Sequence, residues 1–173
     1  MIRRFSLLIS RGCVAVIVAS VGFAGYLLFD LQALASLAKN SLQLSIQWQT
    51  VTQVQWQLLW LLSVIYVAIG LVGLYFLRRA FSHFARGELF NPSNSQDLRM
   101  FSILLFIQAL SKPLHLALSS VLLSWNHPAG QKMLSLSLGT NELKTIALAA
   151  ILLVMSELLV QGSKLENENK LFI

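Results

Sequence analysis

The sequence predicts an all-α membrane protein, a four-transmembrane-helix bundle that forms one integral membrane domain over residues 1–173. Of the 173 residues, 56% are apolar and 12% are charged, whereas a soluble domain has about 25% charged residues. The mean hydropathy is +0.69, and the apolar residues gather in four long runs. Each run approaches the ~20 residues that a helix needs to cross a bilayer. The composition therefore excludes an ordinary soluble domain.

The first two predicted spans, 12–29 and 58–77, contain no charged residue. Arg3, Arg4 and Arg11 precede the first span, so a cleaved signal peptide is an alternative interpretation. A signal peptide usually has an apolar region of only ~7–15 residues, which favours a transmembrane helix. The third span, 100–125, contains polar residues and a proline, and the fourth, 145–162, carries an acidic residue.

The distribution of Lys and Arg predicts that both termini are cytoplasmic, because these residues are retained on that side of the membrane. Nine lie on the side of the termini, at positions 3, 4, 11, 78, 79, 86, 99, 164 and 170. Three lie on the other side, at positions 39, 132 and 144. The tryptophans support this orientation, since all four map to the external boundary: Trp48, Trp56, Trp60 and Trp125.

The external segments 42–48 and 134–138 alternate apolar and polar residues, the period expected of a half-buried strand. Two short strands could pair there. The alternative is that 31–42 extends the first helix and the remainder is an irregular loop, and the sequence leaves both interpretations open.

The residues between the second and third spans predict where one helix ends and the next begins. Residues 77–86 continue the second helix past the membrane, and Gly87 is suited to end it in the left-handed conformation. Ser93, Asn94 or Ser95 would cap the next helix, with Asp97 in its first turn. After the fourth span, residues 161–173 suit a short solvated helix.

Two groups of residues resemble a bacterial membrane family, the domain of unknown function 2975. One is the loop Phe-Ala-Arg-Gly-Glu-Leu-Phe at 84–90, followed by Asn94 and Leu98-Arg99. The other is the C-terminal set Glu157, Gly162, Leu165, Glu168, Asn169 and Ile173. Members usually have threonine before the last residue, where this chain has Phe172. The resemblance implies a small four-helix protein of the bacterial inner membrane, with members often encoded beside a helix-turn-helix regulator. It implies no established activity.

This resemblance suggests a surface for a cytoplasmic partner such as a helix-turn-helix regulator. Its residues are Gly87, Phe90, Asn94, Arg99, Glu157, Gly162, Glu168 and Asn169. A structural interpretation is nearly as well supported: the glycine ends a helix, the phenylalanine anchors in the interface, and the tail is a solvated end.

A polar face on the third span is the sharpest local feature. Gln108, Lys112, His115 and Ser119 are spaced four, three and four residues apart, so they share one side of a helix. A charge at mid-membrane costs at least ~2.5–3.5 kcal/mol, so this face should turn into the bundle or toward water. Either it forms a site for a ligand, ion or proton, or Lys112 extends to the interface and the others bond between helices. We expect Glu157 at the cytoplasmic interface rather than paired with Lys112, because the two differ in depth.

The remaining chemistry is sparse, and the sequence predicts no enzyme, no cofactor and no metal site. A single cysteine excludes a dithiol centre, only one histidine lies deep in a span, and there is no glycine-rich phosphate loop or nucleophile elbow. The net charge of +6 is explained by topology and by anionic lipid, so no direct nucleic-acid binding is expected.

Two functional classes remain. The first is a non-catalytic sensory or regulatory protein that acts through a cytoplasmic partner, and the sequence favours it. The second is a small oligomeric transporter or channel that uses the polar face. The lipid bilayer is a partner in both, and a homo-oligomer is compatible with either.

Overall fold

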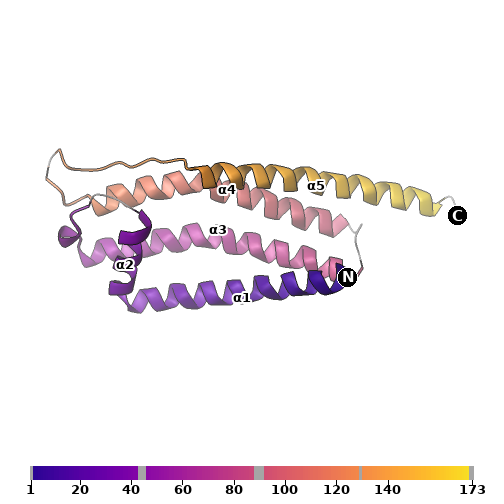
Figure 1. Ribbon diagram of the computed structural model, residues 1–173, viewed down its shortest axis with the longest axis horizontal. Coiled ribbons are helices and arrows are strands. Elements are labelled where there is room, and N and C mark those ends of the chain that lie inside the picture. Colours follow the sequence, from indigo (N-terminus) through magenta and orange to yellow (C-terminus); the bar gives the residue numbers. More distant parts are fainter. Residues whose placement is uncertain (1, 43–45, 88–91, 129, 172–173) are drawn as a thin grey trace.

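The computed structural model describes residues 2–42, 46–87, 92–128 and 130–171. Four long helices dominate it (Figure 1): α1 (Ile2–Phe29), α3 (Gln53–Ala85), α4 (Pro92–Leu123) and α5 (Thr140–Leu171). Between α1 and α3 lie a short helix, α2 (Leu31–Leu42), and a 3₁₀ turn, η1 (Trp48–Thr50). The prediction of an all-α fold with four membrane-spanning helices is confirmed, since each long helix is long and apolar enough to cross a bilayer.

The long helices lie side by side in the order α1, α3, α4, α5, with each packed mainly on its neighbour in that order. Figure 1 shows this row and places both chain termini at one end, here called the termini end. The opposite end, called the α2 end, carries α2, η1 and the connection from α4 to α5. All four tryptophans lie at the α2 end, in η1, in the first turns of α3 and just after α4.

The helices pack through small side chains and expose large apolar ones. Buried positions on the long helices include Ala80, Ala85, Ser102, Ala109, Ala117, Ser119, Ser120, Ala149 and Ser156. Large apolar side chains instead point outward along every long helix, as Leu110, Leu114 and Leu118 do on α4. This distribution reverses that of a soluble core and is typical of helices that approach closely within lipid.

Asp30 separates α1 from α2 and caps the shorter helix. Its Oδ1 accepts hydrogen bonds from the backbone N–H groups of Gln32 and Ala33, at 3.1 and 3.0 Å, which satisfies free donors of the first turn. These backbone bonds, and a further one from the Tyr26 hydroxyl, lower the pKa of the Asp30 carboxyl. Residues 31–42 are therefore a separate helix that turns across the bundle (Figure 1), not an extension of the first one.

A small apolar core closes the α2 end. Leu59 of α3 and Leu123 of α4 are buried at its centre, and Ala38 of α2 and Ile46 pack on them. The buried side chain of Gln55 joins the same elements, because its Nε2 donates to the carbonyl oxygen of Leu122 at 2.7 Å. α2 and the segment before α3 thus bury the ends of α3 and α4.

An extended segment, residues 131–139, docks on α4 through two buried serines. Ser120 Oγ accepts from the backbone N–H of Ser135 at 2.9 Å, and Ser124 Oγ accepts from that of Met133 at 3.0 Å. The strand pairing that the sequence left open is absent from the described residues: 134–138 runs extended without a strand partner, and residues 43–45 of the other segment lie outside the described part. Two backbone N–H groups of this segment, those of Met133 and Ser135, donate to serine side chains instead.

His127 links the segment before α3 to the connection between α4 and α5 through hydrogen bonds. Its Nε2 accepts from the backbone N–H of Gln47 at 3.3 Å, and its Nδ1 lies 3.2 Å from the carbonyl oxygen of Gln131. Because a carbonyl oxygen only accepts, the arrangement assigns the ring proton to Nδ1. The Gln47 side chain also joins the two segments, because its Nε2 donates a hydrogen bond to Oε1 of Gln131 at 3.1 Å.

At the termini end, the sequence predicted the end of α3 correctly but did not predict the start of α4. α3 ends at Ala85, and Gly87 has a φ of +86°, as its position predicts. However, α4 begins at Pro92, before the three residues expected to cap it. Proline favours the first helical position because it needs no backbone donor there. Asp97 consequently lies beyond the first turn, where it pairs with Arg79 of α3 at 3.2 Å.

Candidate functional site

A polar cavity of about 710 Å³ opens near the α2 end, where α2, α4, the extended segment and α5 meet. Its lining includes Ser41 of α2, Lys112 and His115 of α4, Ser137 of the extended segment, and Asn141 and Glu142 of α5. The cavity exists because α5 begins only opposite the middle of α4, while the extended segment covers the rest of α4.

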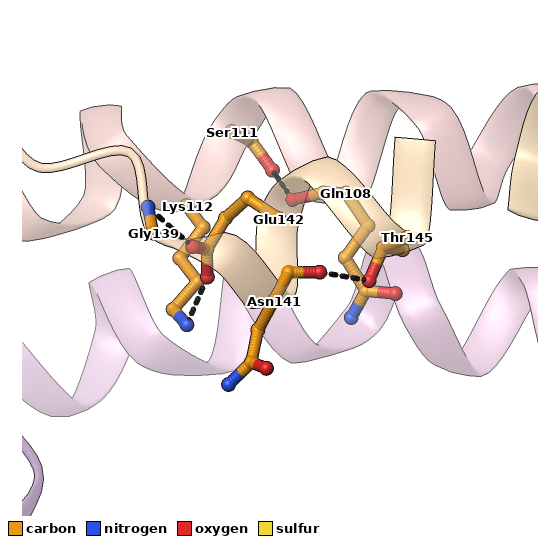
Figure 2. Close-up of polar contacts among 7 residues, drawn as sticks. All are labelled: Gln108, Ser111, Lys112, Gly139, Asn141, Glu142 and Thr145. Atoms are coloured by element: carbon orange, nitrogen blue, oxygen red, sulfur yellow. Dashed lines mark hydrogen bonds and ion pairs between the residues drawn. The ribbon is translucent and has the colours of Figure 1, made fainter. Parts of the chain in front are cut away.

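An ion pair between Lys112 and Glu142 forms one wall of the cavity (Figure 2). Glu142 is the third residue of α5, and its Oε2 accepts from the backbone N–H of Gly139 at 2.7 Å. This is the glutamate half of a capping box, which fixes where the helix begins. The carboxylate side chain is only 6% exposed, whereas the Lys112 side chain is 52% exposed. Lys112 is therefore the more accessible member of the pair.

His115 lies one turn further along α4, against α3. Its Nε2 is 3.3 Å from the hydroxyl oxygen of Ser63, and its ring centroid is 5.0 Å from that of Tyr66. Two α3 side chains thus hold the imidazole while another part of it lines the cavity.

The other two residues of the predicted polar face do not line the cavity. Gln108 packs on α3 at Gly70, where a Cβ atom would come within 2.5 Å of its Nε2. Ser119 is fully buried, and its hydroxyl has no hydrogen-bond partner among the described residues. The structure therefore turns this face toward α3 and α5 but brings only Lys112 and His115 into one site.

Sequence reasoning missed the acidic partner of Lys112. The run Gly-Thr-Asn-Glu at 139–142 was the available signal, since a glutamate three residues after a helix start is typical of a capping box. Glu157, the next acidic residue of α5, lies fifteen residues further along the helix and is exposed. At 1.5 Å per residue this is about 22 Å from Glu142, so Lys112 does not reach it.

The residues predicted to form a partner surface lie toward the termini end. Gly87 and Arg99 are exposed, Asn94 is buried in the first turn of α4, and Gly162 is half-buried on α5. Glu168 and Asn169 belong to the last turns of α5, and Phe90 lies outside the described residues. The tail is a direct continuation of α5, not a separate short helix.

The residues of the cavity are suited to polar binding, with no grouping for metal ligation. Within the described ranges, no three side chains of His, Cys, Asp or Glu come close enough together to hold a metal ion. The cavity offers an ammonium group, an imidazole, hydroxyls and an amide. Such groups bind and orient a polar ligand through charge and hydrogen bonds.

Four apolar helices, a small-residue interior and an outward apolar surface define the class: a multi-pass α-helical membrane protein. Residues 13–173 match the family described as a protein of unknown function, DUF2975, and the chain belongs to that family. No curated protein matches the chain, and no solved structure does.

Proposed function

We propose that this protein is a non-catalytic sensor of the bacterial inner membrane that signals to a soluble cytoplasmic partner. One observation carries the proposal: α5 is a single helix whose first turn lines the polar cavity and whose last turns project past the other helices at the termini end (Figure 1). Its 32 residues span about 48 Å at 1.5 Å per residue. One rigid element therefore connects the two regions.

The Lys112–Glu142 pair is the contact through which a ligand acts in this proposal. A ligand that draws the ammonium away from Glu142 changes the packing of α5 on α4 at the helix start. Because a helix moves as a body, a small shift or rotation there reaches the tail. The ligand stabilises whichever arrangement it binds more tightly.

The cavity favours sensing over transport. A transport pathway needs polar groups along the full depth of the membrane, yet Gln108 of the same polar face packs on Gly70 and does not line the cavity. An inverted repeat, which many transporters show, is also not evident in the sequence.

The proposal places both termini in the cytoplasm and the cavity toward the external side, as the Lys and Arg count indicates. Reporters that are active only outside the cytoplasm test this orientation. We expect activity from fusions after Asn40 and after Gln131, and none from a fusion at the C-terminus. Activity of the C-terminal fusion together with silence of the other two would overturn the orientation.

The partner surface is proposed to comprise the termini-side connection and the end of α5, with a helix-turn-helix regulator as the expected partner. Asp97 and Lys112 are fifteen residues apart on α4. Glu142 and Glu157 are fifteen residues apart on α5, which runs antiparallel to α4. Glu157 is therefore about level with Asp97, and residues beyond 163 project past the start of α4 (Figure 1). That projection makes the tail accessible to a soluble protein.

Deletion of Leu165–Ile173 is expected to abolish capture of this partner while membrane insertion remains intact, because the deletion leaves all four candidate spans complete. The measurement is affinity purification from native membranes with quantification of co-purified proteins. Lys132→Gln, at the opposite end of the bundle, is the matched control and should not change the yield. Recovery of the same partner at full yield by the truncated protein would contradict a role for the tail.

A further inference from the structure

A second polar pocket, of about 210 Å³, lies near the termini end of α3. It is lined by Tyr75, Arg78, Arg79 and Ser82, which lie on neighbouring turns of one side of the helix. Pockets that enclose a whole drug-sized ligand usually measure ~300–1,000 Å³. The pocket on α3 is therefore suited to one charged group of a larger molecule.

Two guanidinium groups give this pocket its charge. Arg79 is held through its Nε by an ion pair with Asp97 at 3.2 Å, and no contact in the described part of the chain engages its terminal N–H groups. Arg78 is exposed and forms no ion pair or hydrogen bond with the residues that the structure describes. A guanidinium group presents its N–H donors in a planar fork that matches the oxygens of a phosphate. The pair of arginines therefore favours a phosphate ligand.

The remaining lining residues add one further donor. The Ser82 hydroxyl donates to the carbonyl oxygen of Arg79 at 2.7 Å, so its proton is already used within the helix. The Tyr75 side chain is 49% exposed, and its hydroxyl is free to donate. No carboxylate lines the pocket. Because Asp97 offsets the charge of Arg79, the uncompensated positive charge of the pocket belongs to Arg78.

An apolar row leads from this pocket toward the centre of the bilayer. The arginines directly follow the uncharged run 58–77, so the bilayer centre lies toward lower residue numbers on α3. On that side, exposed residues recur every three or four positions at Tyr75, Val72, Ala68, Ile65, Leu61 and Leu58.

The length of the row matches one leaflet of the membrane. Tyr75 belongs both to the pocket lining and to the row. The ten residues from Tyr75 to Ile65 span about 15 Å at 1.5 Å per residue, which is half of the ~30 Å hydrocarbon core. A molecule held by a phosphate group in the pocket can therefore lay an acyl chain along the row within the hydrocarbon of its own leaflet.

We propose that this pocket binds the phosphate group of an anionic membrane phospholipid, with an acyl chain along the row from Tyr75 to Ile65. Arg78 and Arg79 donate to the phosphate oxygens, and the Tyr75 hydroxyl donates to a head-group oxygen. The uncompensated charge of Arg78 favours a lipid with a net negative charge over a zwitterionic one. The site lies at the opposite end of the bundle from the polar cavity, so the inference goes beyond the proposed sensor and does not depend on it.

The test is photo-cross-linking of the full chain in phosphatidylcholine vesicles. The vesicles contain a small fraction of phosphatidylglycerol or phosphatidylcholine that carries a photoreactive group in one acyl chain, and mass spectrometry locates the cross-links. We expect the phosphatidylglycerol probe to label the row from Ile65 to Tyr75 more strongly than the phosphatidylcholine probe does. Unlabelled phosphatidylglycerol should displace the probe, whereas inorganic phosphate should not.

Arg78→Gln is the main variant, because it removes the uncompensated charge and leaves the Arg79–Asp97 ion pair in place. Below saturation, its labelling by the phosphatidylglycerol probe should fall about tenfold, as expected for the loss of a charge-assisted contact. Arg99→Gln is the matched control, since Arg99 is an exposed arginine at the same end of the bundle that does not line the pocket. Its labelling should stay within about twofold of the wild type, because salt screens exposed charges.

Three outcomes would overturn the proposal: equal labelling of the row by the two probes in the wild type, an equal loss in the two arginine variants, or full displacement of the probe by inorganic phosphate. The last would assign the pocket to a soluble phosphate. The first and third are measured on the wild type, so they do not depend on how a variant folds.

Discussion

Lys112→Met is expected to destabilise the protein more than removal of both members of its ion pair. The substitution leaves the Glu142 carboxylate with the Gly139 N–H as a partner but without a counter-charge, in a side chain that is 6% exposed. Breaking a buried pair by removing one partner leaves an uncompensated charge, whereas removing both does not. Thermal unfolding in detergent, followed by circular dichroism, should therefore give the lowest midpoint for the single variant.

The double variant Lys112→Met with Glu142→Gln is the control that isolates this effect. Glutamine keeps an oxygen for the Gly139 N–H, so the start of α5 retains its cap. We expect the double variant to recover most of the lost stability. A double variant as unstable as the single one would mean that the pair itself, rather than the stranded charge, holds α5 in place.

Leu123→Ala is expected to cost about 3 kcal/mol of stability, the usual scale for emptying a buried leucine site. Leu123 has no exposed surface and lies at the centre of the apolar core that joins α2, Ile46 and the ends of α3 and α4. The measurement is the free energy of unfolding from denaturant titration in detergent.

Leu114→Ala, on the same helix, is the matched control for this prediction. Its side chain is 60% exposed on the outward surface of α4, so lipid or detergent fills the space that alanine leaves. The expected change is small. Similar losses in the two variants would show that the core at the α2 end contributes no more than a lipid-facing contact.

The number and order of the spanning helices could be predicted from the sequence, and for a simple reason. In a bilayer the backbone must satisfy its own hydrogen bonds, so a long apolar run has a helix as its only stable form. The runs 12–29 and 58–77 lie within α1 and α3, and Gly87 ends α3 at a positive φ. These features are local, and local sequence was sufficient.

The start of α4 and the structure of the α2 end could not be predicted from these patterns. The alternation in 134–138 is real, but Ser135 and Ser137 line the cavity, and the backbone N–H of Ser135 donates to Ser120 of α4 instead of to a second strand. A period of two reports an extended chain with two different faces and does not identify the partner. Likewise, α4 begins at Pro92, so the residues expected to cap it, at 93–95, lie inside the helix.

The candidate site, too, could be predicted from the sequence only in part. The sequence by itself determined that Lys112 and His115 share one side of a membrane helix and must avoid lipid, since charge at that depth is costly. Only the tertiary structure decided that Lys112 meets Glu142, thirty residues away, and that Gln108 and Ser119 lie outside the cavity. The reason is that helical spacing fixes the direction of a side chain on its own helix, whereas the late start of α5 fixes what lies opposite it.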